Sequence, residues 1–199
     1  MNDTDMMSWE DPCAFVGFPK IARLVRTCII TEKIDGTNAS VHINDYGDIW
    51  AGKRTGWITP DNDNFGFAAW VEAHKAELVQ LGPGRHFGEW WGNGIQRGYG
   101  LPKGDKRFSL FNVAVWGDGD EADKKRRVRP ACCYVVPVLS VGDFTTNRVE
   151  ACLTLLAATG SQAAPGFMKP EGVIVYHTAN NVSFKQTYDS DRKSEKRTV

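Results

Sequence analysis

The sequence has no excess of charge of either sign. Its 199 residues include 24 Lys or Arg and 24 Asp or Glu, so the formal net charge at pH 7 is zero. Proteins that coat nucleic acids often carry a basic excess, and the balance observed here therefore disfavours a general nucleic-acid coat protein. It leaves open an enzyme that binds RNA through a local basic surface.

Long apolar runs are also missing. No stretch approaches the roughly 20 residues that a membrane-spanning helix needs. Residues 1–11 are acidic and polar, unlike a secretory signal peptide. We therefore expect a cytoplasmic protein with no membrane partner. The cysteines are odd in number and include no Cys-x-x-Cys pair, which predicts buried thiols rather than disulfides or a zinc site.

The pattern of apolar residues predicts one α+β domain. Apolar and polar residues alternate strictly from Asn38 to Asn44, as in a half-buried strand. The turn over 45–48 predicts a hairpin to a returning strand over 49–53. Many strands, two helices and hairpin connections are typical of an α+β domain with largely antiparallel sheets. A chain of this length is sufficient for one domain with a sizeable core.

The other elements follow from periodicity and turn residues. Asn147 and Glu150 have the spacing of a capping box, which predicts the start of the second helix. We expect a lead-in over 1–19, a folded domain over 20–189 and a loose tail over 190–199. Further strands are predicted over 24–32, 85–91, 108–116, 132–138, 171–176 and 182–187, and the first helix over 67–81.

The stretch with the clearest chemical content is Thr31-Glu32-Lys33-Ile34-Asp35-Gly36-Thr37-Asn38. It places a lysine at a strand end, then a carboxylate, then a glycine turn. A lysine amine becomes a nucleophile when its pKa is lowered from the free value of about 10.4. Alone, such a string is weak evidence, because an ordinary surface lysine beside a turn is the more frequent explanation.

The surrounding sequence strengthens the functional interpretation. The run resembles motif I of the covalent nucleotidyltransferases, which include polynucleotide ligases and capping enzymes, and it is especially similar to RNA ligases related to phage T4 RNA ligase 2. The resemblance covers about residues 20–188. Five further motifs follow in the order of that family: Ala51-Gly52-Lys53-Arg54-Thr55, Phe87-Gly88-Glu89-Trp90, Phe108-Ser109-Leu110-Phe111-Asn112-Val113, Glu171-Gly172-Val173-Ile174-Val175 and Ser183-Phe184-Lys185-Gln186-Thr187.

The resemblance implies a nucleotidyltransferase (ATP-grasp-like) domain of antiparallel sheets with flanking helices. We expect no OB-fold, because too few residues follow the last motif. It implies that Lys33 attacks the α-phosphorus of ATP to form lysyl-AMP, with Arg54 and Lys185 as catalytic phosphate-binding partners. Many ligases carry a second lysine where this chain has Thr187. Glu89 and Glu171 would hold Mg²⁺ or Mn²⁺. The nucleotide-binding residues implied in this way are Glu32, Ile34, Asn38, Arg54, Glu89, Phe111, Glu171 and Lys185.

The expected function is an ATP-dependent RNA ligase that adenylates a 5′-phosphate RNA end and seals it to a 3′-hydroxyl end. A partner domain or protein is a candidate for docking the RNA. The alternatives are a minimal ATP-dependent DNA ligase and a non-catalytic module that binds nucleotides or RNA ends. The glycine-rich loop over 92–100 is either a phosphate cradle or a plain turn. The basic run over 124–129 is more often a solvated loop than an RNA clamp.

Overall fold

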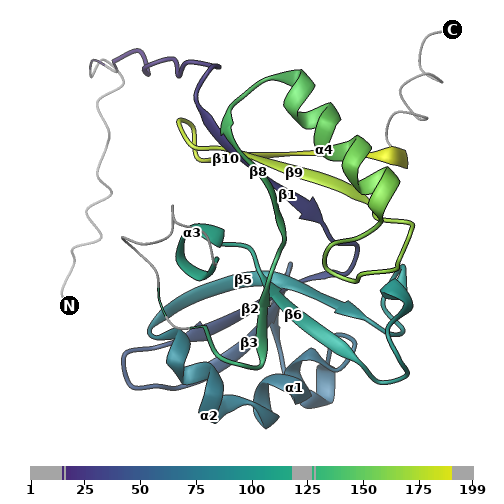
Figure 1. Ribbon diagram of the computed structural model, residues 1–199. Coiled ribbons are helices and arrows are strands. Elements are labelled where there is room, and N and C mark those ends of the chain that lie inside the picture. Colours follow the sequence, from purple (N-terminus) through teal and green to yellow (C-terminus); the bar gives the residue numbers. More distant parts are fainter. Residues whose placement is uncertain (1–14, 16, 118–126, 128, 190–199) are drawn as a thin grey trace, which may run out of the picture.

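The computed structural model describes residues 15, 17–117, 127 and 129–189. The predicted tail over 190–199, and most of the predicted lead-in and of the basic run, lie outside these residues. The described strands form two sheets, one above the other in Figure 1. Sheet A has the strand order β10-β9-β1-β8, and sheet B has the order β4-β3-β2-β5-β6-β7.

Sheet A is antiparallel and is covered on its outer face by helix α4 (Thr146–Thr159), as Figure 1 shows. Cys28 and Ile30 of the first strand pack with Leu156 of this helix. Because side chains alternate between the two faces of a strand, Lys33 points to the inner face. The strands of sheet A are β1 (Thr27–Lys33), β8 (Val138–Asp143), β9 (Gly172–His177) and β10 (Val182–Thr187).

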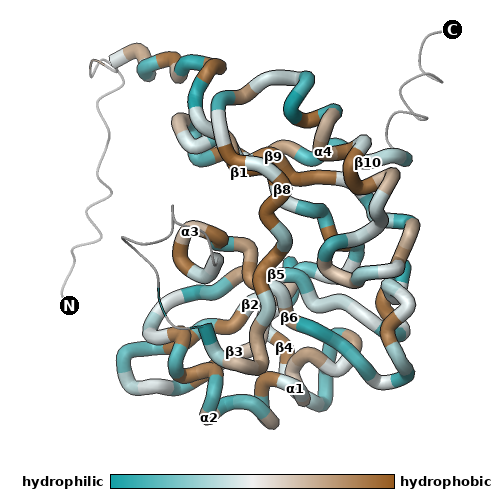
Figure 2. The backbone as a smooth tube through the Cα atoms, in the orientation of Figure 1, coloured by the Kyte–Doolittle hydropathy of each residue, from teal (hydrophilic) through white to brown (hydrophobic). Residues whose placement is uncertain are grey.

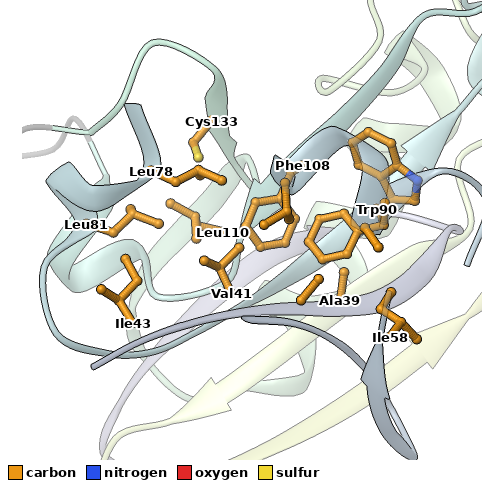
Figure 3. Packing of buried hydrophobic residues seen from close by; sticks show 14 of the residues in the cluster. Ala39, Val41, Ile43, Ile58, Leu78, Leu81, Trp90, Phe108, Leu110 and Cys133 are labelled. Carbon is orange, nitrogen blue, oxygen red and sulfur yellow. The ribbon is translucent and has the colours of Figure 1, made fainter. Parts of the chain in front are cut away.

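Sheet B is antiparallel except for the parallel pair β6–β7. Helices α1 (Phe67–Ala73) and α2 (Lys75–Leu78) lie along its outer face (Figure 1), where Val41, Trp90 and Phe108 form the main core (Figure 3). Its inner face is turned toward sheet A. The strands are β2 (Thr37–Ile43), β3 (Ile49–Lys53), β4 (Gly56–Ile58), β5 (Gly84–Gly92), β6 (Lys106–Leu110) and β7 (Cys133–Val135).

Besides the hydrophobic cores on the outer faces of the two sheets, a further cluster joins the sheets at one end. Ile34, Trp91, Tyr99, Val136 and Ala164 pack together there and are buried. The chain passes from sheet A to sheet B after β1 and returns between β7 and β8, where hydrophobic residues run along the connection (Figure 2). The remaining short helices are α3 (Val113–Trp116), η1 (Pro60–Asn62), η2 (Val79–Leu81) and η3 (Gly98–Gly100).

The predicted α+β class with largely antiparallel sheets is confirmed, and so is the hairpin that contains β3. Cys28, Cys133 and Cys152 are buried free thiols, as the sequence predicts. Among the described residues, no helix is long and apolar enough to cross a membrane.

Four predicted boundaries were wrong. The strand over 108–116 ends at Leu110, where its pairing with β7 ends, and the following residues form α3 to bury Trp116 in the core. The strand over 132–138 is interrupted at Pro137, which separates β7 from β8. The first helix is divided at His74 into α1 and the segments after it. Helix α4 is capped by Thr145, whose Oγ1 accepts a hydrogen bond from the Arg148 N–H at 3.2 Å, rather than by Asn147.

Candidate active site

The predicted nucleophile is paired with a carboxylate from the far end of the chain. Lys33 ends β1 and lies opposite Gly172 at the start of β9, which places Glu171 beside it. The Nζ atom of Lys33 donates a hydrogen bond to Oε2 of Glu171 at 2.5 Å. The two side chains are 21% and 17% exposed. The ion pair is therefore partly buried but still open to a ligand.

Glu89 brings a second carboxylate from sheet B to the same place. On the inner face of this sheet it lies opposite Asn38, whose Nδ2 donates a hydrogen bond to Glu89 Oε2 at 3.4 Å. The backbone N–H of Gly36 donates to Glu89 Oε1 at 3.0 Å. Burial raises the pKa of Glu89 to about 7. The positive charge of Lys33 lowers this pKa, and the negative charge of Glu171 raises it further. Lys33, Glu89 and Glu171 thus interact electrostatically across the two sheets.

Gly36 is required for this approach of the two sheets. A Cβ atom at this position would lie 2.4 Å from the carbonyl oxygen of Trp90 and 2.7 Å from Cβ of Trp91. Contacts this close to backbone atoms cannot be relieved without moving the turn. Only glycine therefore allows the turn after Lys33 to press against β5 and to present its N–H to Glu89.

Arg97, in the glycine-rich loop, connects the segments on either side of the Lys33–Glu171 pair. Its Nε donates to Asp35 Oδ2 at 2.9 Å, its Nη2 to Asp189 Oδ2 at 2.7 Å and its Nη1 to the Lys169 carbonyl oxygen at 3.3 Å. Asp35 is two residues after the lysine, and Lys169 is two residues before the glutamate. The sequence alone allowed either a phosphate cradle or a plain turn for this loop, and no sequence pattern identified the partners of Arg97.

We expect Arg97→Ala to slow the reaction predicted from the sequence, covalent labelling of Lys33 by ATP, roughly tenfold or more, because the two segments would no longer be held in register. Arg97→Lys should restore only part of the rate, since an ammonium group cannot reproduce the planar fork of donors. Single-turnover incorporation of α-labelled ATP measures the rate. The matched control is Arg23→Ala, an exposed arginine that precedes β1. Equal rates in wild type and Arg97→Ala would contradict this role.

Of three other predicted residues, the strand register places one on an inner face. Lys185 on β10 lies opposite Ile174, which lies opposite Thr31, so its side chain shares the Lys33 face of sheet A. It is exposed and makes no hydrogen bond or ion pair with another described residue. Phe111 directly follows β6 and is 40% exposed. Arg54 lies in the turn between β3 and β4, and within the described part of the chain it has no such partner.

Two predicted nucleotide-binding side chains are kept apart from this cluster. The Glu32 carboxylate is 1% exposed on the α4 side of sheet A, where its Oε2 accepts hydrogen bonds from the N–H groups of Gln162 and Ala163 at 2.8 and 3.0 Å. Burial raises its pKa, and these hydrogen bonds act in the opposite direction. Ile34 is 3% exposed in the cluster that joins the sheets. Both side chains fix the backbone on either side of Lys33.

The two carboxylates of the cluster fit a divalent cation. Within the described ranges, no group of three His, Cys, Asp or Glu side chains is arranged as a complete metal site. Mg²⁺ commonly uses only one or two protein carboxylates and takes its other ligands from water and substrate phosphates. Burial is the main cause of the raised pKa of Glu89, because the charged carboxylate is poorly solvated there, and a bound cation would offset this cost.

The comparison with protein families decides the identity of this domain. The RNA ligase family model matches residues 26–192. The chain belongs to the RNA ligase family. This is a family of nucleotidyltransferase ligases. No curated protein sequence matches the chain.

Solved structures agree with the family at the level of the fold. A point mutant of the Naegleria gruberi RNA ligase with AMP and Mn has a TM-score of 0.55 and 18% identity, over 85% of this chain and 52% of that chain. The same ligase with PPi gives 0.53 and 19%, with the same coverage. Another mutant, with ATP and Mn, gives 0.55 and 18%. This RNA ligase family member therefore spans about half the length of those chains and shares the fold of that half.

Proposed function

We propose that this member of the RNA ligase family is an ATP-dependent RNA ligase of the kind related to phage T4 RNA ligase 2. The observation that carries the proposal is the position of the Lys33 amine, held at 2.5 Å by Glu171 and in electrostatic contact with Glu89 between the inner faces of the two sheets. The Naegleria structures that contain ATP or AMP with Mn support the choice of nucleotide and metal.

In the first step, the Lys33 ammonium group loses a proton to solvent, leaves its ion pair with Glu171 and attacks the α-phosphorus of ATP. A nitrogen–phosphorus bond forms, and the bond from this phosphorus to the pyrophosphate oxygen breaks. Lys185 and Arg54 offset the charge of the phosphates, and the exposed ring of Phe111 stacks on the adenine. Mg²⁺ or Mn²⁺ held by Glu89 and Glu171 would supply charge compensation for the triphosphate.

Two transfers complete the reaction. The 5′-phosphate of one RNA end attacks the phosphorus of the lysyl-AMP, which frees the amine of Lys33 and leaves AMP on the RNA. The 3′-hydroxyl of the other end then attacks that 5′-phosphate and displaces AMP. The covalent intermediate divides one difficult condensation into easier in-line transfers.

One experiment separates the ligase from other functions of the same fold. One sample of the protein is incubated with α-labelled ATP and Mg²⁺ and then denatured to detect covalent label. A second, native sample is tested with ATP and Mg²⁺ on nicked duplexes with RNA or DNA 3′-hydroxyl strands. Covalent label and preferential sealing of RNA ends are expected. Sealing of DNA ends alone would instead identify a DNA ligase. Absence of covalent label would leave a module that only binds nucleotides or RNA ends.

Lys185→Ala should reduce lysine adenylation roughly 10²- to 10³-fold, the usual loss when one charge-stabilising donor is removed from a transition state. The effect should be large because Thr187 supplies no second ammonium group on β10. Label incorporation under single-turnover conditions measures it. Lys103→Ala, an exposed lysine in a loop, is the control. A rate within twofold of wild type would show that Lys185 does not contact the phosphates.

A further inference from the structure

The inner face of sheet B continues past the candidate site as two rows of mainly aromatic side chains. Glu89 and Asn38 form one row across the sheet. Two residues further along β5, Phe87 lies opposite Ser40, which lies opposite Gly52, which lies opposite Trp57. In the next row, Trp50, His42 and Arg85 are paired in the same way. The exposed fractions are 51% for Trp57, 56% for Phe87 and 41% for Trp50.

The two ends of this face differ. On the other side of Glu89, Trp91 is 1% exposed because Tyr99 and Val136 cover it in the cluster that joins the sheets. A polymer whose end reaches Lys33 therefore cannot continue in that direction along the face. The open direction leads over the two aromatic rows, which lie about 7 and 13 Å from the Glu89 row at 3.3–3.4 Å per strand residue.

The two tryptophan rings of these rows contact neighbouring groups that restrict their positions. A Cβ atom at Gly52 would lie 3.2 Å from two ring atoms of Trp57, so this indole rests over the glycine while about half of its surface stays exposed (51%). The His42 ring centroid is 5.6 Å from that of Trp50 and 5.8 Å from that of Trp57. The Arg85 guanidinium lies 5.2 Å from the Trp57 centroid. Such a surface needs little reordering to receive a planar ligand.

The residue types in these rows indicate which kind of ligand the surface binds. Their strand residues include no Asp or Glu and no Leu, Ile, Val or Met, and their charged member is Arg85. Aromatic residues and arginine are also enriched in protein–protein interfaces, but these rows lie on the path that an RNA end at Lys33 would follow. Rigid aromatic rings beside arginine match the bases and phosphates of a single nucleic-acid strand.

We propose that Trp50, Trp57, Phe87 and Arg85 form a platform for a single-stranded segment of RNA next to the end that is joined. The bases stack on the rings, and Arg85 contacts a phosphate. The inference rests on the proposed ligase function, because only that function brings an RNA end to Lys33. It assigns the RNA path to the β3–β4 side of sheet B and predicts binding with little dependence on base sequence.

The test measures binding of a fluorescent oligouridylate of about 12 nucleotides by anisotropy, without ATP or divalent metal. Trp57→Ala should weaken binding about tenfold, the usual size for loss of one stacked base, and Trp50→Ala should also weaken it. Trp57→Phe should stay within about threefold of wild type because the ring is retained. The matched control is Phe184→Ala, which removes a 57% exposed ring that shares the outer face of sheet A with Val175.

Self-adenylation with ATP, which needs no RNA, is measured on the same variants and should be close to wild type for Trp57→Ala. Unchanged RNA affinity in both tryptophan variants would overturn the platform, as would an equal loss in Phe184→Ala. Stronger binding of duplex RNA than of the single strand would overturn it as well. A wild-type protein that never forms the adduct refutes the ligase instead, which keeps the two failures separate.

Discussion

Lys33→Ala is expected to abolish covalent labelling of this protein by α-labelled ATP. No other described lysine combines a place between the two inner faces with an ion pair to Glu171 and an electrostatic interaction with Glu89, so no substitute nucleophile should act. The label that survives denaturation should fall by roughly 10³-fold or more, as for loss of a covalent nucleophile. Sealing of RNA ends from ATP should disappear with it.

The stability of the same variant separates chemistry from folding. The Lys33–Glu171 ion pair is partly exposed, and such pairs contribute about 0–1 kcal/mol after solvent screening. Chemical denaturation should therefore show nearly wild-type stability. Lys75→Ala is the control, because that lysine also pairs with a carboxylate, Glu72 at 2.7 Å, but lies on α2 along the outer face of sheet B. Persistent label in Lys33→Ala, or equal loss in Lys75→Ala, would contradict the assignment.

A pre-adenylated substrate gives the second readout for Lys33. An RNA that already carries AMP on its 5′-phosphate bypasses the first two transfers, in which the amine forms and breaks its bond to phosphorus. Lys33→Ala should therefore still seal this substrate, at a reduced rate. Failure on ATP together with success on adenylated RNA locates the function of the amine in the covalent step, and failure on both would indicate a general defect of the site.

The sequence singled out both residues of the ion pair because each belongs to a motif, and the motifs follow one another in the order of the family. Lys33 and Glu171 are 138 residues apart, but each stands at the end of a recognisable strand, and the two strands pair. Glu89 was found in the same way. The α+β class followed from hairpin turns and alternation, which are local properties of the sequence.

What the sequence missed depends on the direction of side chains and on the paths of loops. Glu32 and Ile34 flank Lys33 in the motif, but alternation turns Glu32 toward α4, and Ile34 is buried where the two sheets meet. The partners of Arg97 lie 62 residues before it and 72 and 92 residues after it, so no local pattern could reveal them. The aromatic platform was hidden for the same reason, because its rows form only when β2, β3, β4 and β5 are paired.

Glu171→Gln is the variant that tests how the carboxylate acts on the lysine and the metal. The amide keeps the size of the side chain and can still accept a hydrogen bond from Lys33, but it has no charge to hold a divalent cation. Adenylation should fall roughly 10²- to 10³-fold, as for the loss of one electrostatic group in a transition state. The Mn²⁺ concentration for half-maximal activity should rise at least tenfold.

Stability again distinguishes this role from a structural one. Glu171 is only partly buried, so the amide should change the free energy of unfolding by less than about 1 kcal/mol. Glu150→Gln, an exposed glutamate on α4, is the matched control and should leave the rate and the metal dependence unchanged. If Glu171→Gln kept wild-type metal dependence, the cation would have to be held without Glu171. If it lost stability in proportion to activity, the ion pair would serve the fold rather than the reaction.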